Sequence, residues 1–179
     1  MAITSQTQID VRPASPDDAV DIAKLGAHVF SATFGHSVQP HELKAYLDDS
    51  YSTEATTKDI SDPSRDMIVA TNEDGQIVGF GLLTRGSSEP CIAHVGSTIE
   101  LQRLYVHPDF HGKGIGKILV NTMENMARKQ AFKHMWLGVW EENHKAQRVY
   151  EKLGYKIVGD HDFVIGGVIQ TDHIMLKEL

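Results

Sequence analysis

The sequence predicts an α/β protein in which one mixed β-sheet carries helices on its faces. The first observation is a pair of apolar, β-branched runs separated by Asp74-Gly75, the strongest short signal for a β-hairpin. The second is an apolar strand, Thr98 to Val106, that leads through a glycine-rich segment into an amphipathic helix. The third is an alternation of strand and helix that ends in two strands. We expect a single domain over residues 1–179, because this length supports one core and no linker interrupts the pattern.

The N-terminal half is expected to form one strand and then helices. Ile9 to Ala14 alternates and ends near a proline, which is typical of a short strand. The segment "SPDD" that follows supplies an N-cap serine, a proline for the first turn and two early acids, so we expect a helix over Asp17 to Ala32. Apolar residues at helical spacing predict a second helix over Pro40 to Tyr51, and a short third helix follows with Ser52 or Thr53 as its cap.

The C-terminal half is expected to alternate strands with helices. Asn143 and Gly154 bracket the last predicted helix as its N-cap and its stop. Arg85 to Ser97 is rich in turn residues and predicts a loop. The other predicted elements are strands Asp66–Thr71, Ile77–Thr84 and Thr98–Val106, helix Gly114–Ala131, strand Met135–Trp140, and closing strands Tyr155–Asp160 and Thr171–Leu179.

The composition is that of a globular protein and argues against several classes. A formal net charge of −7 disfavours a nucleic-acid binder, which normally presents a basic face. No apolar run reaches the ~18 residues that a membrane span needs, and the N-terminal segment lacks the pattern of a secretory signal. Cys91 is the only cysteine, which excludes an internal disulfide and fits the reducing cytoplasm.

The segment "HGKGIG" carries glycine at three alternate positions immediately before a predicted helix. A P-loop aligned on its last glycine would place His111 and Ile118 where a glycine and a hydroxyl residue are required. A dinucleotide fingerprint would place Lys117 where its third glycine belongs. Both motifs are therefore excluded.

What remains is a strand-to-helix loop whose backbone N–H groups can face one concavity. The helix that follows adds the partial positive charge of its N-terminus, and two lysines are available to screen an anion. The loop is either a phosphate site or a turn with additional glycines.

The motifs "LYVHPDFHGKGIGKIL" and "WEENHKAQRVYEKLGY" resemble motifs A and B of the GNAT family of N-acetyltransferases, and the resemblance runs from about Ile68 to the C-terminus. His111 departs from the pattern, because relatives carry arginine or glutamine there. The segments "WLGVWEENHKA", "TIELQRLYV" and "QTDHIM" further resemble the PaiA-type branch of polyamine N-acetyltransferases.

The resemblance implies a GNAT-type fold with a mostly antiparallel sheet of six or seven strands, whose fourth and fifth strands splay apart. It also implies acetyl-CoA as the cofactor, with its pantetheine arm paired along the fourth strand and its pyrophosphate on the glycine loop. The positions that it assigns to the cofactor are Leu104, Tyr105, Val106, His111, Gly112, Lys113, Gly114, Ile115, Gly116, Lys117, Asn143, Lys145, Ala146 and Tyr150.

The same resemblance assigns the chemistry of acetyl transfer to an amine. Glu100 matches a glutamate base, acting directly or through water, and period-2 alternation would put it and Gln102 on the same face of the strand as Leu104. A backbone N–H of Leu104 or Tyr105 would stabilise the developing oxyanion. Tyr150 matches the general acid that protonates the leaving thiolate. Glu100 alternatively faces solvent, and Tyr150 alternatively only packs on its helix.

The acceptor is expected to be a small cationic amine, a polyamine such as spermidine or spermine. Spaced carboxylates and aromatic walls would bind it, and the candidates are Phe34, Tyr46, Glu100, Trp140 and Glu141. Another small amine, an amino acid or a peptide amine is the alternative acceptor, and a non-catalytic acetyl-CoA sensor is the alternative class. We expect no metal, since no ligand spacing is present. The resemblance also allows a homodimer.

Overall fold

In the computed structural model, which describes residues 8–165 and 167–179, seven strands form one sheet in the order β1-β2-β3-β4-β5-β7-β6. All neighbouring strands pair antiparallel except β4 and β5, which are parallel. The start of the N-terminal segment, where no secretory signal is predicted, lies outside the described residues. The elements are β1 (Asp10–Pro13), α1 (Ala19–Phe34), α2 (Pro40–Ser50), α3 (Thr53–Ser61), β2 (Arg65–Thr71), β3 (Ile77–Arg85), β4 (Thr98–Val106), α4 (Ile115–Lys129), β5 (His134–Trp140), α5 (His144–Lys152), β6 (Lys156–Ile165) and β7 (Val168–Glu178).

Most of these elements follow the sequence prediction, with two corrections. The "SPDD" segment forms a separate 3-10 turn with a capping box, so α1 begins two residues later than predicted and ends at Phe34. The closing strands β6 and β7 extend farther toward each other than predicted, because residues 161–165 and 168–170 also pair. None of the described helices has both the length and the apolar character that a bilayer span requires.

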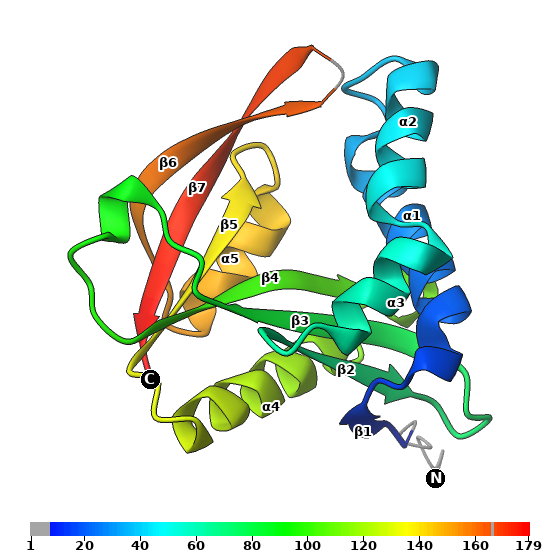
Figure 1. The fold of residues 1–179 in the computed structure, drawn as a ribbon, viewed down its shortest axis with the longest axis horizontal. Coiled ribbons are helices and arrows are strands. Elements are labelled where there is room, and N and C mark those ends of the chain that lie inside the picture. Colours follow the sequence, from blue (N-terminus) through cyan, green and yellow to red (C-terminus); the bar gives the residue numbers. More distant parts are fainter. Residues whose placement is uncertain (1–7, 166) are drawn as a thin grey trace, which may run out of the picture.

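The sheet separates two apolar layers, as alternation along β2 shows. Ile68 and Ala70 pack in the core under α4, whereas Met67 and Val69 pack on the opposite face with Ile22 of α1. Helix α5 joins the α4 layer, and α1, α2 and α3 cover the other face. The tip of the β6–β7 hairpin rises toward α2 (Figure 1), where Ile165 packs against Phe30. Helices therefore lie on both faces, as predicted.

A β-bulge in β4 overturns one prediction about the active strand. The pairing of β4 with β3 shifts between Leu101 and Arg103, which leaves Gln102 as an extra residue. Leu101 and Leu104 consequently pack in the same apolar layer, although an uninterrupted strand would send them to opposite faces. Glu100 and Leu104 thus lie on opposite faces, and the predicted shared face is wrong.

The strands β4 and β5 separate soon after they meet, which confirms the predicted splay. Their pairing comprises Thr98 with His134, Ile99 with Met135, and Glu100 with Trp136. Beyond Glu100, β4 has no strand partner on this side among the described residues, although β3 covers its other edge. We call this separation the fork.

Candidate active site

A cavity of about 1040 Å³ occupies the fork and reaches both faces of the sheet. On one side it is bounded by the glycine loop and α5, and on the other by α1, α2 and the β6–β7 hairpin. Leu104, Tyr105 and Val106 of β4 line it where their strand lacks a partner. An unpaired strand edge inside a sheet is a ready site for an extended ligand.

The glycine loop forms an open cradle at the start of α4. Gly112 and Gly114 have φ angles of 76° and 79°, and a Cβ atom at either would meet nothing within 4 Å. Gly114 is also the N-cap of α4 and makes no side-chain cap hydrogen bond. The first N–H groups of this helix are therefore available to an anion.

The other loop positions differ in how they contribute. Ile115, Gly116 and Lys117 line the cavity, but Lys113 does not, and its Nζ atom lies 4.5 Å from the centre of the Phe110 ring. His111 lines the cavity, with its Nε2 atom 2.9 Å from the carbonyl oxygen of Val106.

A carbonyl oxygen can only accept, so Nε2 of His111 carries a hydrogen and donates a hydrogen bond to the Val106 carbonyl. The arginine or glutamine of relatives is thus replaced by a ring tied to β4. The backbone N–H groups and Lys117 are the other groups of this loop that could contact an anion.

Helix α5 brings four predicted cofactor residues to the same cavity. Asn143 is the N-cap, because its side chain accepts a hydrogen bond from the N–H of Ala146 at 3.2 Å. Asn143, Lys145, Ala146 and Tyr150 all line the cavity. The Tyr150 ring packs edge-on against Tyr155 with a centroid separation of 5.8 Å, and burial raises the pKa of its phenol. The group is therefore protonated throughout the neutral range.

The opposite end of the cavity is largely aromatic. Phe34 lies 4.9 Å from Trp140 between ring centroids, and Tyr46 stacks on Phe30 at 4.8 Å. Phe34, Tyr46 and Trp140 all line the cavity as predicted acceptor residues. Glu141 is exposed and does not line it, whereas its neighbour Glu142 does.

Carboxylates gather on the same side, and sequence reasoning missed two of them. Glu100 lines the cavity, and burial raises its pKa. Glu89 and Asp172 line it too, as does His161, whose Nδ1 atom lies 3.0 Å from Glu89. Asp172 and Glu89 were missed although Asp172 lies within the predicted strand Thr171–Leu179, because no local motif marks either carboxylate and Glu89 lies in a loop. The alternation of "QTDHIM" along a strand was the signal that could have exposed Asp172.

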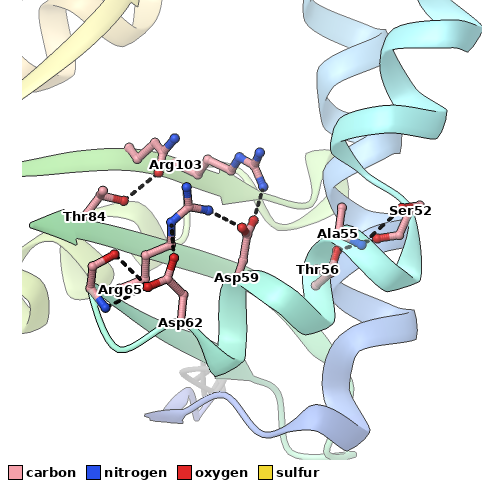
Figure 2. Close-up of polar contacts among 10 residues, drawn as sticks. Ser52, Ala55, Thr56, Asp59, Asp62, Arg65, Thr84 and Arg103 are labelled. Atoms are coloured by element: carbon pink, nitrogen blue, oxygen red, sulfur yellow. Dashed lines mark hydrogen bonds and ion pairs between the residues drawn. The ribbon is translucent and has the colours of Figure 1, made fainter. Parts of the chain in front are cut away.

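A polar network links β4 to α3 on the side of the cavity where the predicted acceptor residues lie. Asp59 of α3 pairs with Arg65 and, at 3.0 Å, with Arg103 (Figure 2). The Arg103 guanidinium lies 4.7 Å from the centre of the Tyr51 ring, and the hydroxyls of Tyr51 and Tyr105 are 2.5 Å apart. Arg103 is thus paired with Asp59 of α3 and forms no ion pair with a carboxylate of the cavity among the described residues.

No group of three or more His, Cys, Asp or Glu side chains within residues 8–165 and 167–179 is arranged to hold a metal ion. The unpaired edge of β4, the glycine cradle and the uncapped start of α4 instead suit a ligand with an extended arm and a phosphate group. The fold and site define the class of acyltransferases that use coenzyme A.

The comparisons with known proteins agree with this class. Residues 30–155 match the Acetyltransferase (GNAT) family. The chain is 32% identical to an uncharacterized N-acetyltransferase of Mycobacterium tuberculosis over 90% of this chain and 98% of that protein. It is 26% identical to the spermine/spermidine N(1)-acetyltransferase of Bacillus subtilis over 59% of this chain and 66% of that protein.

The fold matches the crystal structure of the PaiA N-acetyltransferase of Thermoplasma acidophilum in complex with coenzyme A. The TM-score is 0.77, with 23% identity over 96% of this chain and 99% of that one. The chain belongs to the GNAT family of acetyltransferases. It is an N-acetyltransferase that uses acetyl-CoA.

Proposed function

We propose that the chain transfers the acetyl group of acetyl-CoA to a primary amino group of a polyamine such as spermidine or spermine. The observation that carries the proposal is the acceptor side of the cavity, where aromatic rings and carboxylates occur together. Aromatic faces and carboxylates both attract flexible polycations. The similarity to the Bacillus subtilis spermine/spermidine N(1)-acetyltransferase supports the choice of amine.

The cofactor would lie along the β4 edge, with its phosphates against Gly112 to Lys117. Acetyl-CoA supplies an activated acetyl thioester, and the protein has to orient it and manage two protons. Leu104 or Tyr105 would offer a backbone N–H to the acetyl oxygen at the unpaired edge of β4. Asn143, Lys145 and Ala146 would hold the same arm from α5.

Glu100 is the proposed base. An aliphatic ammonium group is protonated at neutral pH and must lose a proton before it attacks. Burial raises the pKa of Glu100 and thereby makes its carboxylate a better proton acceptor. Because Glu100 lies at the root of the fork, it would take this proton directly or through one water molecule.

Tyr150 is the proposed general acid. Its phenol lines the cavity from α5, on the side of the glycine loop. A raised pKa keeps the proton on Tyr150 until the thiolate leaves.

A cytoplasmic location and a homodimer stay predictions from the sequence.

The test is release of free thiol from acetyl-CoA, followed with DTNB across a panel of amines. The panel should contain spermidine, spermine, a simple monoamine, an amino acid and a short peptide. We expect the highest kcat/KM with the polyamines. Activity confined to the amino acid or the peptide would contradict the polyamine, and tight acetyl-CoA binding without turnover on any amine would indicate a sensor.

A further inference from the structure

One face of β5 lines the acceptor side of the cavity. Trp136, Gly138 and Trp140 alternate along the strand and therefore share one face. The indoles are only 3% and 6% exposed, whereas Gly138 between them is exposed to the cavity. The two tryptophans thus frame a gap at Gly138.

The carboxylate of Asp172 lies over this gap. A Cβ atom built on Gly138 would lie 3.0 Å from Oδ2 of Asp172, so any side chain at 138 would crowd the carboxylate. Trp136 is the last residue of β5 that pairs with β4, and Gly138 is the next residue of β5 on the same face. The carboxylate is therefore held at the fork, with Glu100 on the other strand.

Polar groups at this point lack partners. Within the described part of the chain, the Asp172 carboxylate makes no hydrogen bond and no ion pair, although the two neighbouring histidines do. His161 contacts Glu89 at 3.0 Å, and His173 contacts Asp160 at 2.6 Å.

The Nε1 atoms of both indoles, although deeply buried, also lack a partner among those residues. Unsatisfied polar groups in a cavity are expected where a ligand completes them.

Carboxylates share the cavity with Asp172, and two histidines lie beside it. Glu89 from the loop before β4 and Glu100 from β4 line the same cavity, and His161 and His173 are the neighbouring groups on β6 and β7. The pKa of Asp172 is raised to about 6, mainly by burial and less by Glu89, against the opposing effect of His161 and His173. Glu89 repels both Asp172 and Glu100, and an entering cation would relieve this repulsion.

We propose that Asp172 is a substrate-binding residue whose carboxylate receives the ammonium group of the incoming amine at the fork, across from Glu100. The site then selects acceptors that arrive as cations, and Gly138 serves it by leaving room for the carboxylate. This inference rests on the proposed amine acetylation.

The first test is Asp172→Asn, with Asp162→Asn as the matched control. Asp162 lies on β6, outside the cavity, where it accepts a hydrogen bond from Thr171. In Asp172→Asn we expect the KM for spermidine to rise about 10- to 100-fold, which is the range of one charge-assisted hydrogen bond. The KM for acetyl-CoA should stay within about twofold, and the control should match the wild type.

A binding measurement separates recognition from turnover. Calorimetric titration of spermidine into the CoA-saturated protein should give a Kd that falls as pH rises from 5 to 7, because Asp172 ionises in this window. This pH dependence should be weaker in Asp172→Asn. Gly138→Ala keeps the charge but crowds it, and should raise the Kd several-fold without altering the melting temperature.

Two results would overturn the proposal. One is an Asp172→Asn protein that binds spermidine as tightly as the wild type, and the other is an equal rise of the KM for both substrates. If Asp172→Asn fails to fold, unchanged spermidine affinity in Gly138→Ala is the overturning result. Absence of turnover by the wild type on every amine would instead refute the proposed function, and the calorimetry would still test Asp172.

Discussion

Replacement of Tyr150 by phenylalanine should separate catalysis from binding. The substitution removes one hydroxyl, which has no hydrogen-bond partner among the described residues, and keeps the ring against Tyr155. We therefore expect the free energy of unfolding to change by less than about 1 kcal/mol. Loss of a general acid should lower kcat by about 10²- to 10⁴-fold, which corresponds to roughly 3 to 5.5 kcal/mol of activation free energy.

The assay is thiol release at saturating acetyl-CoA and spermidine, together with calorimetric binding of CoA. The Kd for CoA should not change, because Ala146 and Asn143 remain in place. In the wild type, kcat should not fall on the alkaline side below a pH of about 10, because burial raises the pKa of Tyr150 above the usual phenol value.

Tyr155→Phe is the matched control. Tyr155 lies beside Tyr150 but does not line the cavity, and its hydroxyl donates to Glu124 at 3.2 Å. Its loss should reduce stability and leave kcat unchanged. A Tyr150→Phe enzyme that retains more than a third of wild-type kcat would refute the acid assignment.

Three further predictions concern stability and the cofactor. Lys177→Met should lower the free energy of unfolding by about 3 kcal/mol in a urea titration. Lys177 donates hydrogen bonds of 2.8 Å to both carboxylate oxygens of Glu124, which is 3% exposed. No change would mean that this ion pair is dispensable for stability. Gly114→Ala should raise the Kd for CoA about tenfold, since its φ of 79° costs an L-residue roughly 1–2 kcal/mol; an equal Kd would argue against the cradle. Hydrogen bonding to Arg12 lowers the pKa of Asp18 to about 2. The ionised carboxylate therefore contributes to the free energy of unfolding above pH 4, and this contribution is lost as the pH falls toward 2. Asp18→Asn should weaken the loss of stability in acid and lower the free energy of unfolding by about 1–2 kcal/mol at pH 7.

The fold was largely predictable because its local signals agree with its packing. Asp74-Gly75 forms the turn between β2 and β3, and Asn143 caps α5, as their residue types predict. The hairpin of β6 and β7 was underestimated, because polar residues such as Asp160 and Asp162 alternate along β6, which is largely exposed. When pairing with a neighbouring strand supplies most of a strand's stability, its own sequence shows only a weak strand pattern.

The site was predictable where it depends on one continuous segment. The glycine cradle and α5 lie within short motifs, so their residues could be named from the sequence. Asp172 and Glu89 were not named, because the sheet order β5-β7-β6 and a loop bring them to the fork, and only the alternation along "QTDHIM" pointed to Asp172. The bulge at Gln102 was also hidden, since one extra residue in a strand leaves no distinctive pattern.

The short pairing of β4 with β5 has a thermodynamic consequence. Three residue pairs join two half-sheets, so a ligand that pairs with β4 inside the fork adds backbone bonds that the empty protein does not make. Ligand binding to the native state alone adds RT ln(1 + [L]/Kd), about 2.7 kcal/mol at a hundredfold excess over Kd. The thermal stability of this enzyme should therefore track the concentration of coenzyme A around it, which makes its lifetime a function of metabolic state.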